Sequence, residues 1–395
     1  MVKIIIKNKR ELIGSYINGN YKTTIYSDGT RVRETEEDEF IPAFAENCDI
    51  KITDSCNMGC SFCHEGSTPQ GKHGDILNPK FLKTFHPYQE LSLGGGNLFE
   101  HPDLIPFLEN LKKQKVIANI TVHQVHFIQN LELIKKLQEE KLVYGIGVSV
   151  SAPNEELIKA LKSVPNTVCH VINGIWNERV AEMMVDKNLK VLILGYKELR
   201  RGNDYIAVHD EIVASNKKWL YYNLEKLIKR FKLISFDNLA IEQLEVKRLL
   251  SNEKWEEFYQ GDDGTSTFYI DAINQKFARS STAAFDKRYP IDNLSMDEMF
   301  KIITEEYLKE KIMEKDRINF LKMELENELK KDWRKFVTTS EILEVMIEII
   351  KNRDFQLNDF DIYISKNEIK TLFRKKEFLV FTYSQNPASK IIRIK

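Results

Sequence analysis

The sequence predicts an α/β fold: a partial (β/α)6 barrel of the TIM type, with a small N-terminal β meander and an α+β C-terminal extension. The barrel is predicted because six short apolar runs between Cys48 and Leu194 are each followed by a helical pattern, with short connections. Parallel strands joined by right-handed crossovers collect functional groups at their carboxyl ends. We expect the meander in residues 1–47, the barrel in 48–245, a hairpin segment in 246–294 and an accessory region in 295–395.

Composition restricts the class of protein. The chain has 395 residues, 42% of them hydrophobic and 30% charged, which is ordinary for a soluble protein with a full core. The formal net charge of −1 argues weakly against a large RNA substrate, so a nucleic-acid partner is not favoured. The N-terminus lacks a signal-peptide pattern, and no apolar stretch predicts a membrane span. An odd number of cysteines, five, is not a disulfide framework, so we expect a reducing cytoplasm.

The elements follow from the pattern in chain order. Residues 13–37 alternate around Asn18-Gly19 and Asp28-Gly29, which are hairpin signals, and we expect this meander to pack over one end of the core. The predicted barrel strands are Cys48–Thr53, Tyr88–Leu93, Val116–His123, Val143–Ser151, Thr167–Asn173 and Lys190–Leu194. The predicted helices are Pro102–Lys115, Leu131–Lys141, Asn154–Ser163, Asn177–Lys187 and Lys217–Phe231, with Ile234–Leu244 as a possible seventh element that closes the sheet.

Three of the cysteines lie in one loop just after the first strand. Cys56, Cys60 and Cys63 can ligate three irons of a cubic iron–sulfur cluster and leave the fourth without a protein ligand. A structural zinc site would need a fourth ligand, which nearby only His64 offers. Buried inert thiols are the other alternative, and the polar character of the loop argues against them.

The Cys-x-x-x-Cys-x-aromatic-Cys arrangement, with Phe62 at the aromatic position, resembles the signature of the radical S-adenosylmethionine (SAM) superfamily. The resemblance implies that the three cysteines hold a [4Fe-4S] cluster whose open iron binds the amino and carboxylate groups of SAM. It also implies a flavodoxin-like or ferredoxin-like electron donor and reductive cleavage of SAM to a 5′-deoxyadenosyl radical, which abstracts hydrogen from the substrate. No catalytic residue beyond the cluster is predicted.

Three further stretches resemble SAM-binding positions of this superfamily. Gly95, Gly96 and Asn97 occupy the place of its Gly-Gly-Glu motif, with asparagine replacing the glutamate, although a glycine triplet alone is most often a strand-to-helix turn. At the end of the fourth strand, Ser149 and Ser151 are expected near the SAM ribose and carboxylate, the alternative being small residues packed inside a narrow barrel.

After the fifth strand, Ile172, Asn173 and Gly174 match half of an adenine-side motif, in which Ile172 would contact adenine. After the sixth strand, Tyr196 and Arg200 stand at the predicted barrel mouth. An arginine there can pair with a carboxylate of SAM or substrate, and the alternative is a solvated charge run.

Two residues at the end of the third predicted strand are weaker candidates for contact with substrate. Strand alternation after Thr121 places Gln124 and His126 on one side, where they could touch substrate, although a lone histidine is more often structural.

The hairpin predicted around Asn274-Gln275 resembles the one that opens the SPASM or twitch extension of radical SAM enzymes acting on peptides. No cysteine follows Cys169, so a second cluster is effectively excluded. The hairpin favours a peptide or protein substrate; a nucleotide or nucleic-acid base is the alternative, and a non-catalytic iron–sulfur sensor or binding module is a third hypothesis.

The accessory region carries no catalytic signature. We expect a long helix at Tyr307–Trp333, a helix at Ser340–Lys351 and short strands at Asp361–Ser365, Phe378–Thr382 and Lys390–Ile394. Lid, partner-binding and dimerisation roles stay open beside plain packing.

Overall fold

The computed structural model describes residues 11–313. The chain divides into two compact units, residues 1–304 and 305–395, and the elements below belong to the first. Beyond residue 313, the predicted helices and strands of the accessory region lie outside the described residues. None of the helices in residues 11–313 combines the length and apolar character that crossing a membrane requires.

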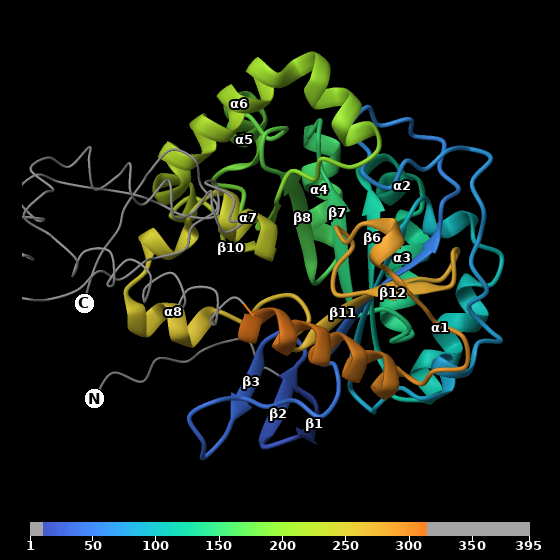
Figure 1. Cartoon of the computed structure of the whole chain (residues 1–395). Coiled ribbons are helices and arrows are strands. Elements are labelled where there is room, and N and C mark those ends of the chain that lie inside the picture. Colours follow the sequence, from blue (N-terminus) through green and yellow to red (C-terminus); the bar gives the residue numbers. More distant parts are fainter. Residues whose placement is uncertain (1–10, 314–395) are drawn as a thin grey trace, which may run out of the picture. The chain divides into compact units, whose positions relative to one another are not determined.

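A ten-stranded sheet organises this unit, in the order β10-β9-β8-β7-β6-β5-β4-β11-β12-β13 (Figure 1). Its parallel part consists of β4 (Asn47–Thr53), β5 (Glu90–Gly95), β6 (Ile117–His123), β7 (Gly145–Ser149), β8 (Thr167–Ile172), β9 (Lys190–Leu194) and β10 (Leu233–Phe236). The six predicted barrel strands correspond to β4–β9, so the predicted α/β fold with a parallel sheet is confirmed. The possible seventh element, predicted at Ile234–Leu244, is a strand only at residues 233–236. This strand, β10, pairs with β9 and forms one end of the sheet, so it does not close the barrel.

Helices cover the outer face of the parallel sheet (Figure 1). They are α1 (Leu104–Lys113), α2 (Gln124–Gln129), α3 (Leu131–Glu139), α4 (Glu155–Ser163), α5 (Glu178–Met184), α6 (Arg201–Ile228) and α7 (Asn238–Gln243). A further helix, α8 (Asn252–Phe258), buries none of its side chains. Short 3-10 turns occur at η1 (Lys80–Lys83), η2 (Leu98–Glu100), η3 (Val246–Leu249) and η4 (Phe285–Lys287). Helix α6 begins sixteen residues before the predicted Lys217 and changes direction at His209, whose φ of −126° is not helical.

Alternation along the strands separates two faces. On β4, Cys48, Ile50 and Ile52 are at most 1% exposed and pack under the helices, whereas Asn47 and Asp49 line an internal cavity. The same alternation continues through the neighbouring strands, since successive side chains point to opposite faces. Polar side chains therefore reach the barrel interior among apolar ones, and its exterior supplies the core.

The meander consists of β1 (Leu12–Asn18), β2 (Tyr21–Tyr26) and β3 (Arg31–Glu34), and it covers the amino ends of the barrel strands (Figure 1). Arg31 pairs with Glu46, just before β4, at 2.6 Å, and with Glu90, at the start of β5. On the other side of the barrel, Asn166 donates to the Ser27 carbonyl at 2.9 Å. This end of the cavity is thus covered by the meander.

The predicted hairpin is present and extends the sheet. Strand β11 (Thr267–Asp271) lies parallel to β4, and β12 (Lys276–Ala278) returns antiparallel to it, followed by β13 (Tyr289–Pro290). The segment before β11 also reaches the far edge of the barrel, where Asn238 donates to Asp263 at 2.7 Å. Hydrogen bonds from Asn238 to the Gly261 carbonyl and to Asp263 therefore link the end of β10 to the segment before β11.

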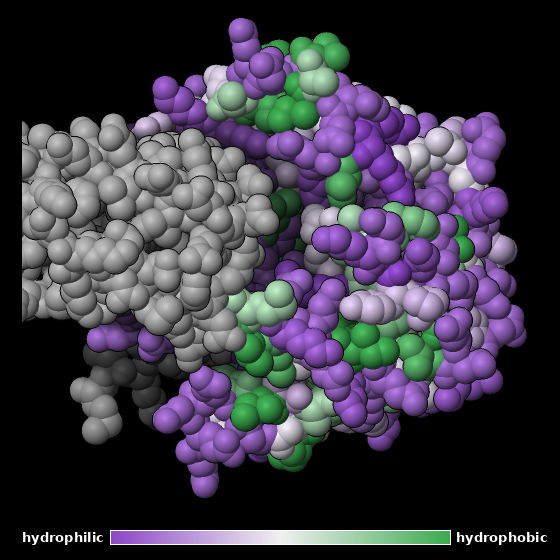
Figure 2. Space-filling view, in the orientation of Figure 1, coloured by the Kyte–Doolittle hydropathy of each residue, from purple (hydrophilic) through white to green (hydrophobic). Residues whose placement is uncertain are grey.

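The outside of this unit is largely hydrophilic on the face drawn in Figure 2, where apolar side chains form small separate groups. Exposed apolar residues such as Leu12 and Val208 lie on different elements. Scattered apolar residues are normal on a protein surface and mark no site. The cavity inside the barrel, into which several polar side chains project, is the better candidate for a site.

Candidate functional site

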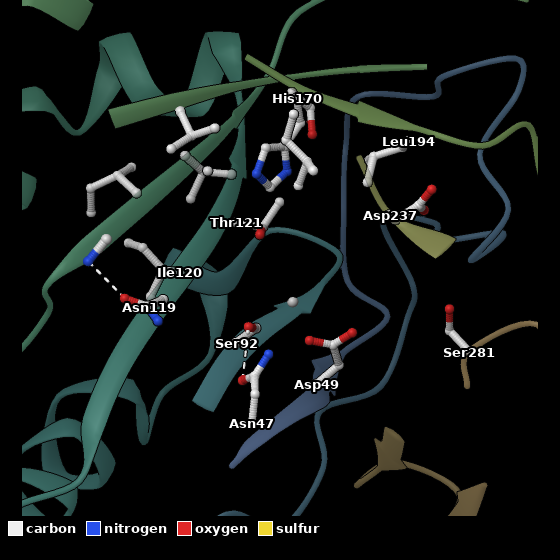
Figure 3. Close-up of a pocket in the computed structure, with 18 of the residues that line it drawn as sticks. Asn47, Asp49, Ser92, Asn119, Ile120, Thr121, His170, Leu194, Asp237 and Ser281 are labelled. Carbon is white, nitrogen blue, oxygen red and sulfur yellow. Dashed lines mark hydrogen bonds between the residues drawn. The ribbon is translucent and has the colours of Figure 1, made fainter. Parts of the chain in front are cut away.

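A cavity of about 810 Å³ runs through the barrel from the meander to the cysteine loop. Figure 3 shows polar side chains from several strands pointing into it, among them Asp49, Asn119, Thr121 and His170. Cys56, Cys60 and Cys63 line the same cavity, at the carboxyl end of β4. Cavities at the carboxyl ends of parallel strands are where α/β folds place their active sites.

The cysteine loop is closed on itself by backbone hydrogen bonds. The Cys56 amide donates to the Thr68 carbonyl at 2.9 Å, and the Thr68 amide donates to the Asp54 carbonyl at 3.1 Å. Within the loop, the Cys63 amide donates to the Cys60 carbonyl at 3.2 Å, which makes a tight turn. The three thiols are thus held on one short closed segment.

Lys51 joins the two ends of this loop. Its side chain is 1% exposed, and its Nζ lies 2.6 Å from Asp54 Oδ1 and 2.8 Å from Glu65 Oε2. Asp54 precedes the three cysteines and Glu65 follows them. Because a buried ammonium is costly without partners, both carboxylates must stay beside it. Burial raises the pKa of Glu65, but the hydrogen bond and charge of His64, followed by the charge of Lys51, hold it well below its usual value.

Gly95 and Gly96 are required by the close approach of the cysteine loop. Gly95 has φ of +118°, and a Cβ there would lie 2.2 Å from the Thr53 carbonyl oxygen. A Cβ on Gly96 would lie 2.1 Å from the Ser55 carbonyl oxygen. The Gly96 amide donates to the Thr53 carbonyl at 2.7 Å, so the second strand end supports the loop.

Gly94, which the sequence analysis did not select, has open space where its Cβ would be and lines the cavity. A ligand can therefore approach the Gly94 backbone without meeting a side chain.

Asn97 turns away from the cavity lining. Its amide donates to the Ser55 carbonyl at 2.6 Å, and its Nδ2 donates to Glu100 at 3.0 Å. Glu100 also accepts a hydrogen bond from the Ser55 hydroxyl, which together with Asn97 lowers the pKa of this carboxyl. The side chain at the position of the motif's glutamate thus belongs to a network behind the loop.

Arg200, at the start of α6, also contacts the loop rather than the cavity. Its guanidinium donates to the Glu65 carbonyl, and the next residue, Arg201, donates to the Ser67 carbonyl at 2.9 Å. Sequence reasoning expected Arg200 to meet a carboxylate of SAM or substrate, a role that stays a prediction. A backbone carbonyl as partner leaves no trace in a sequence pattern.

Tyr196 and Asn173 are buried at a junction with α7. Gln243 accepts hydrogen bonds from Asn173 Nδ2 at 3.0 Å and from the Tyr196 amide at 2.9 Å. The Tyr196 hydroxyl donates to the Gly202 carbonyl at 2.8 Å. Gly174 faces α6, where a Cβ would lie 2.9 Å from Val213.

The predicted site residues therefore fall into two groups. Those that line the cavity together are Cys56, Cys60, Cys63, Phe62, Gly95, Gly96, Ser149, Ser151 and Ile172. Those placed outside its lining are Asn97, Asn173, Gly174, Tyr196 and Arg200.

The alternation expected for Gln124 and His126 is wrong, because β6 ends at His123 and α2 begins at Gln124. Gln124 Oε1 accepts hydrogen bonds from the amides of Ser151 and Ala152, which fixes the end of β7. His126 meets Asn57 of the cysteine loop at 3.0 Å. His123, the last strand residue, is the one that lines the cavity.

Sequence reasoning missed the polar groups in the middle of the barrel. Asp49 and His170 occupy cavity-facing positions of β4 and β8. Burial lowers the pKa of His170 to about 4, so its imidazole is neutral at pH 7. Both lie at alternate positions between buried apolar residues, which is the signal that could have found them.

The thiol set fits a cluster. Burial raises the pKa of Cys60, and the neighbouring Cys63 and Cys56 thiols raise it further, so three thiolates need a cationic group among them. Within residues 11–313, no group of three or more His, Cys, Asp and Glu side chains is arranged to hold a metal ion. Ligands of a cubic cluster each bind a different iron and need not converge on one point. His64, the fourth ligand that a zinc site would need, pairs instead with Glu65 at 3.2 Å.

The family model described as the Radical SAM superfamily matches residues 50–201. Residues 50–201 therefore carry a domain similar to the Radical SAM superfamily. Its members are enzymes that use a [4Fe-4S] cluster and SAM, and here Cys56, Cys60 and Cys63 would hold the cluster. Gly94, whose Cβ position is open, lines the same cavity as these cysteines.

Similarity to individual proteins is limited. A curated relative, a probable dual-specificity RNA methyltransferase RlmN from Lachnospira eligens, is 30% identical over 125 residues, which are 28% of this chain and 34% of the relative. The chain thus spans about a third of the length of that relative.

Two solved structures are of Streptococcus suis SuiB. The one bound to S-adenosylmethionine has a TM-score of 0.38 and 15% identity over 63% of this chain and 64% of that chain. The one bound to its precursor peptide SuiA has a TM-score of 0.35 and 18% identity over 60% of each chain.

Replacing Lys51 by methionine tests how the loop is held. Lys51→Met leaves Asp54 and Glu65 side by side without their cation, and we expect the cluster-free protein to lose roughly 3 kcal/mol of unfolding free energy. Urea unfolding followed by circular dichroism measures this, and iron content after reconstitution should fall with it.

Lys229→Met is the matched control, because Lys229 pairs with Glu225 on the surface, where both side chains are more than 70% exposed. A Lys51→Met protein as stable and as rich in iron as this control would contradict the role given to Lys51.

Proposed function

We propose that this enzyme cleaves SAM reductively and directs the resulting radical at a peptide or protein substrate. The observation that carries the proposal is the position of three cysteines, on a loop tied to β4, in the lining of the cavity inside the barrel. When bound, the cluster would supply one electron to the sulfonium of SAM, giving methionine and a 5′-deoxyadenosyl radical that takes hydrogen from the substrate.

The residues of the chain have three tasks in this proposal. Cys56, Cys60 and Cys63 hold the cluster, and the exposed backbone of Gly94 lies where SAM can approach. Ser149 and Ile172 offer a hydroxyl and an apolar contact from the neighbouring strand ends. The meander and the segment before β11 would limit the access of water from the amino end and one side of the cavity, which protects a reactive radical. The electron would come from a flavodoxin-like or ferredoxin-like protein.

The hairpin β11–β12 supports a peptide or protein substrate, since it stands beside β4 where the SPASM-like extension is expected. A nucleotide or nucleic-acid base is the second candidate, supported by the 30% identity to a probable RNA methyltransferase over 125 residues. The near-neutral charge of this chain counts against a large nucleic acid.

The chemistry is tested by anaerobic reconstitution with iron and sulfide, addition of dithionite and SAM, and assay of 5′-deoxyadenosine by mass spectrometry. We expect the product from the wild type and not from the triple Cys56→Ala, Cys60→Ala, Cys63→Ala variant. Cys169→Ala is the matched control, because this thiol is 1% exposed in β8 and should leave the activity intact. A bound cluster without product in the wild type would favour a non-catalytic sensor.

The place of SAM is tested at Gly94. Gly94→Val fills the open space above this backbone, and we expect the Kd for SAM to rise about tenfold, or about 1.4 kcal/mol, while iron content stays unchanged. Isothermal titration of reconstituted protein with SAM measures this, with Gly94→Ala as a smaller step. An unchanged Kd in both variants would place SAM elsewhere.

The substrate class is tested by incubating the active enzyme with peptide pools and with nucleotide pools. Mass changes confined to peptides are expected, because the hairpin favours that class. A modified nucleoside with no altered peptide would reject the peptide proposal in favour of the second candidate.

A further inference from the structure

The middle of the cavity carries carboxylates that the cluster and SAM positions do not use. Asp49 projects from β4, Asp237 follows β10 and Asp263 precedes β11, and all three line the cavity. Figure 3 shows Asp49 and Asp237 bordering the same space from opposite edges of the barrel. Burial raises the pKa of Asp49, and the charges of Asp263 and Asp237 add to this, whereas Lys197 opposes them.

Asp49 is the carboxylate that remains available to a ligand. Asp237 Oδ1 already accepts two amide hydrogen bonds, from Gly195 and Ala240, each at 2.8 Å, and Asp263 accepts one from Asn238. Asp49 has no ion pair in the described part of the chain, and its side chain is open to the cavity. The Asp49 side chain is exposed to the cavity and interacts with the Ser92 hydroxyl, so its charge is not neutralised by an ion pair and can attract a cation that enters.

Two buried hydroxyls line the same cavity and await a partner. Tyr269 is 4% exposed and stands in register with Asp49, on the strand next to β4. Ser67, at the end of the cysteine loop, is 3% exposed. Neither hydroxyl has a hydrogen-bond partner within residues 11–313. Leaving a buried hydroxyl unpaired costs about 1–3 kcal/mol, so both point to a ligand with polar atoms.

We propose that Asp49 binds a cationic nitrogen of the substrate, an amine or a guanidinium, with Asp237 adding to the negative potential behind it. The nitrogen enters the middle of the barrel, and polar atoms beside it reach Tyr269 and Ser67. This inference rests on the proposed function for the use of the cavity as a substrate site. It narrows the substrate to a peptide or small molecule that presents a lysine, an arginine or a free amine.

Binding of a simple diamine tests this inference. Radiolabelled 1,5-diaminopentane and the uncharged 1,5-pentanediol are compared by equilibrium dialysis against the whole chain, reconstituted and saturated with SAM. We expect the diamine to bind one per chain and the diol not to bind. Asp49→Asn should weaken the diamine at least about tenfold. Asp186→Asn, which removes a surface carboxylate paired with Arg230, should not change its affinity.

Equal binding of diol and diamine, or an Asp49→Asn protein that binds the diamine as well as the wild type does, would overturn the inference. Loss of the diamine when SAM is added would also overturn it, because the carboxylates would then belong to the SAM position. If Asp49→Asn fails to fold, the comparison of diamine with diol on the wild type decides alone.

The two proposals fail separately. Diamine binding without formation of 5′-deoxyadenosine would keep the cationic site and reject the proposed chemistry. Formation of 5′-deoxyadenosine without diamine binding would do the reverse.

Discussion

One buried ammonium group, that of Lys51, ties the cysteine loop to the sheet. Its partners Asp54 and Glu65 stand on either side of the three cysteines, so a single atom on β4 fixes both ends of the loop. A lysine that is 1% exposed cannot give up these partners without a large loss of free energy. The loop ends are therefore held by ion pairs that do not depend on iron.

Neighbouring segments of the chain pack against the loop that Lys51 holds in place. Gly95 and Gly96 allow the second strand end to approach within hydrogen-bonding distance of residues 53–55, where any side chain would collide. Arg200 and Arg201 bind the far end of the loop through its carbonyls. The meander and the segment before β11 then cover the amino end and the side of the barrel. The carboxyl end, where the cysteines lie, adjoins a cavity whose polar lining is set by strand alternation.

Much of this architecture could be predicted from the sequence, because the determining patterns are local. Strand alternation and hairpin turns predict the sheet and the meander, and the spacing of Cys56, Cys60 and Cys63 predicts the metal loop. Gly95 could be predicted as a site residue because a glycine at a strand end allows another backbone segment or a ligand to approach closely. The positions of Tyr196 and Arg200 could not be predicted, because each donates to a backbone carbonyl that only the fold brings close. The Tyr196 hydroxyl donates to the Gly202 carbonyl, and the Arg200 guanidinium donates to the Glu65 carbonyl. Asp49 alternates with the buried Cys48 and Ile50, but that alternation alone does not show whether its side of β4 faces solvent or a cavity.

The central claim is that the cysteine loop holds a four-iron cluster with one iron left open for SAM. Mössbauer spectroscopy of protein reconstituted with ⁵⁷Fe, recorded before and after addition of SAM, tests it most directly, because it reports each iron separately. The claim predicts that one iron in four changes its signal when SAM is added, while the three cysteine-bound irons keep theirs. Four irons that respond alike, or a spectrum that SAM leaves unchanged, would contradict it.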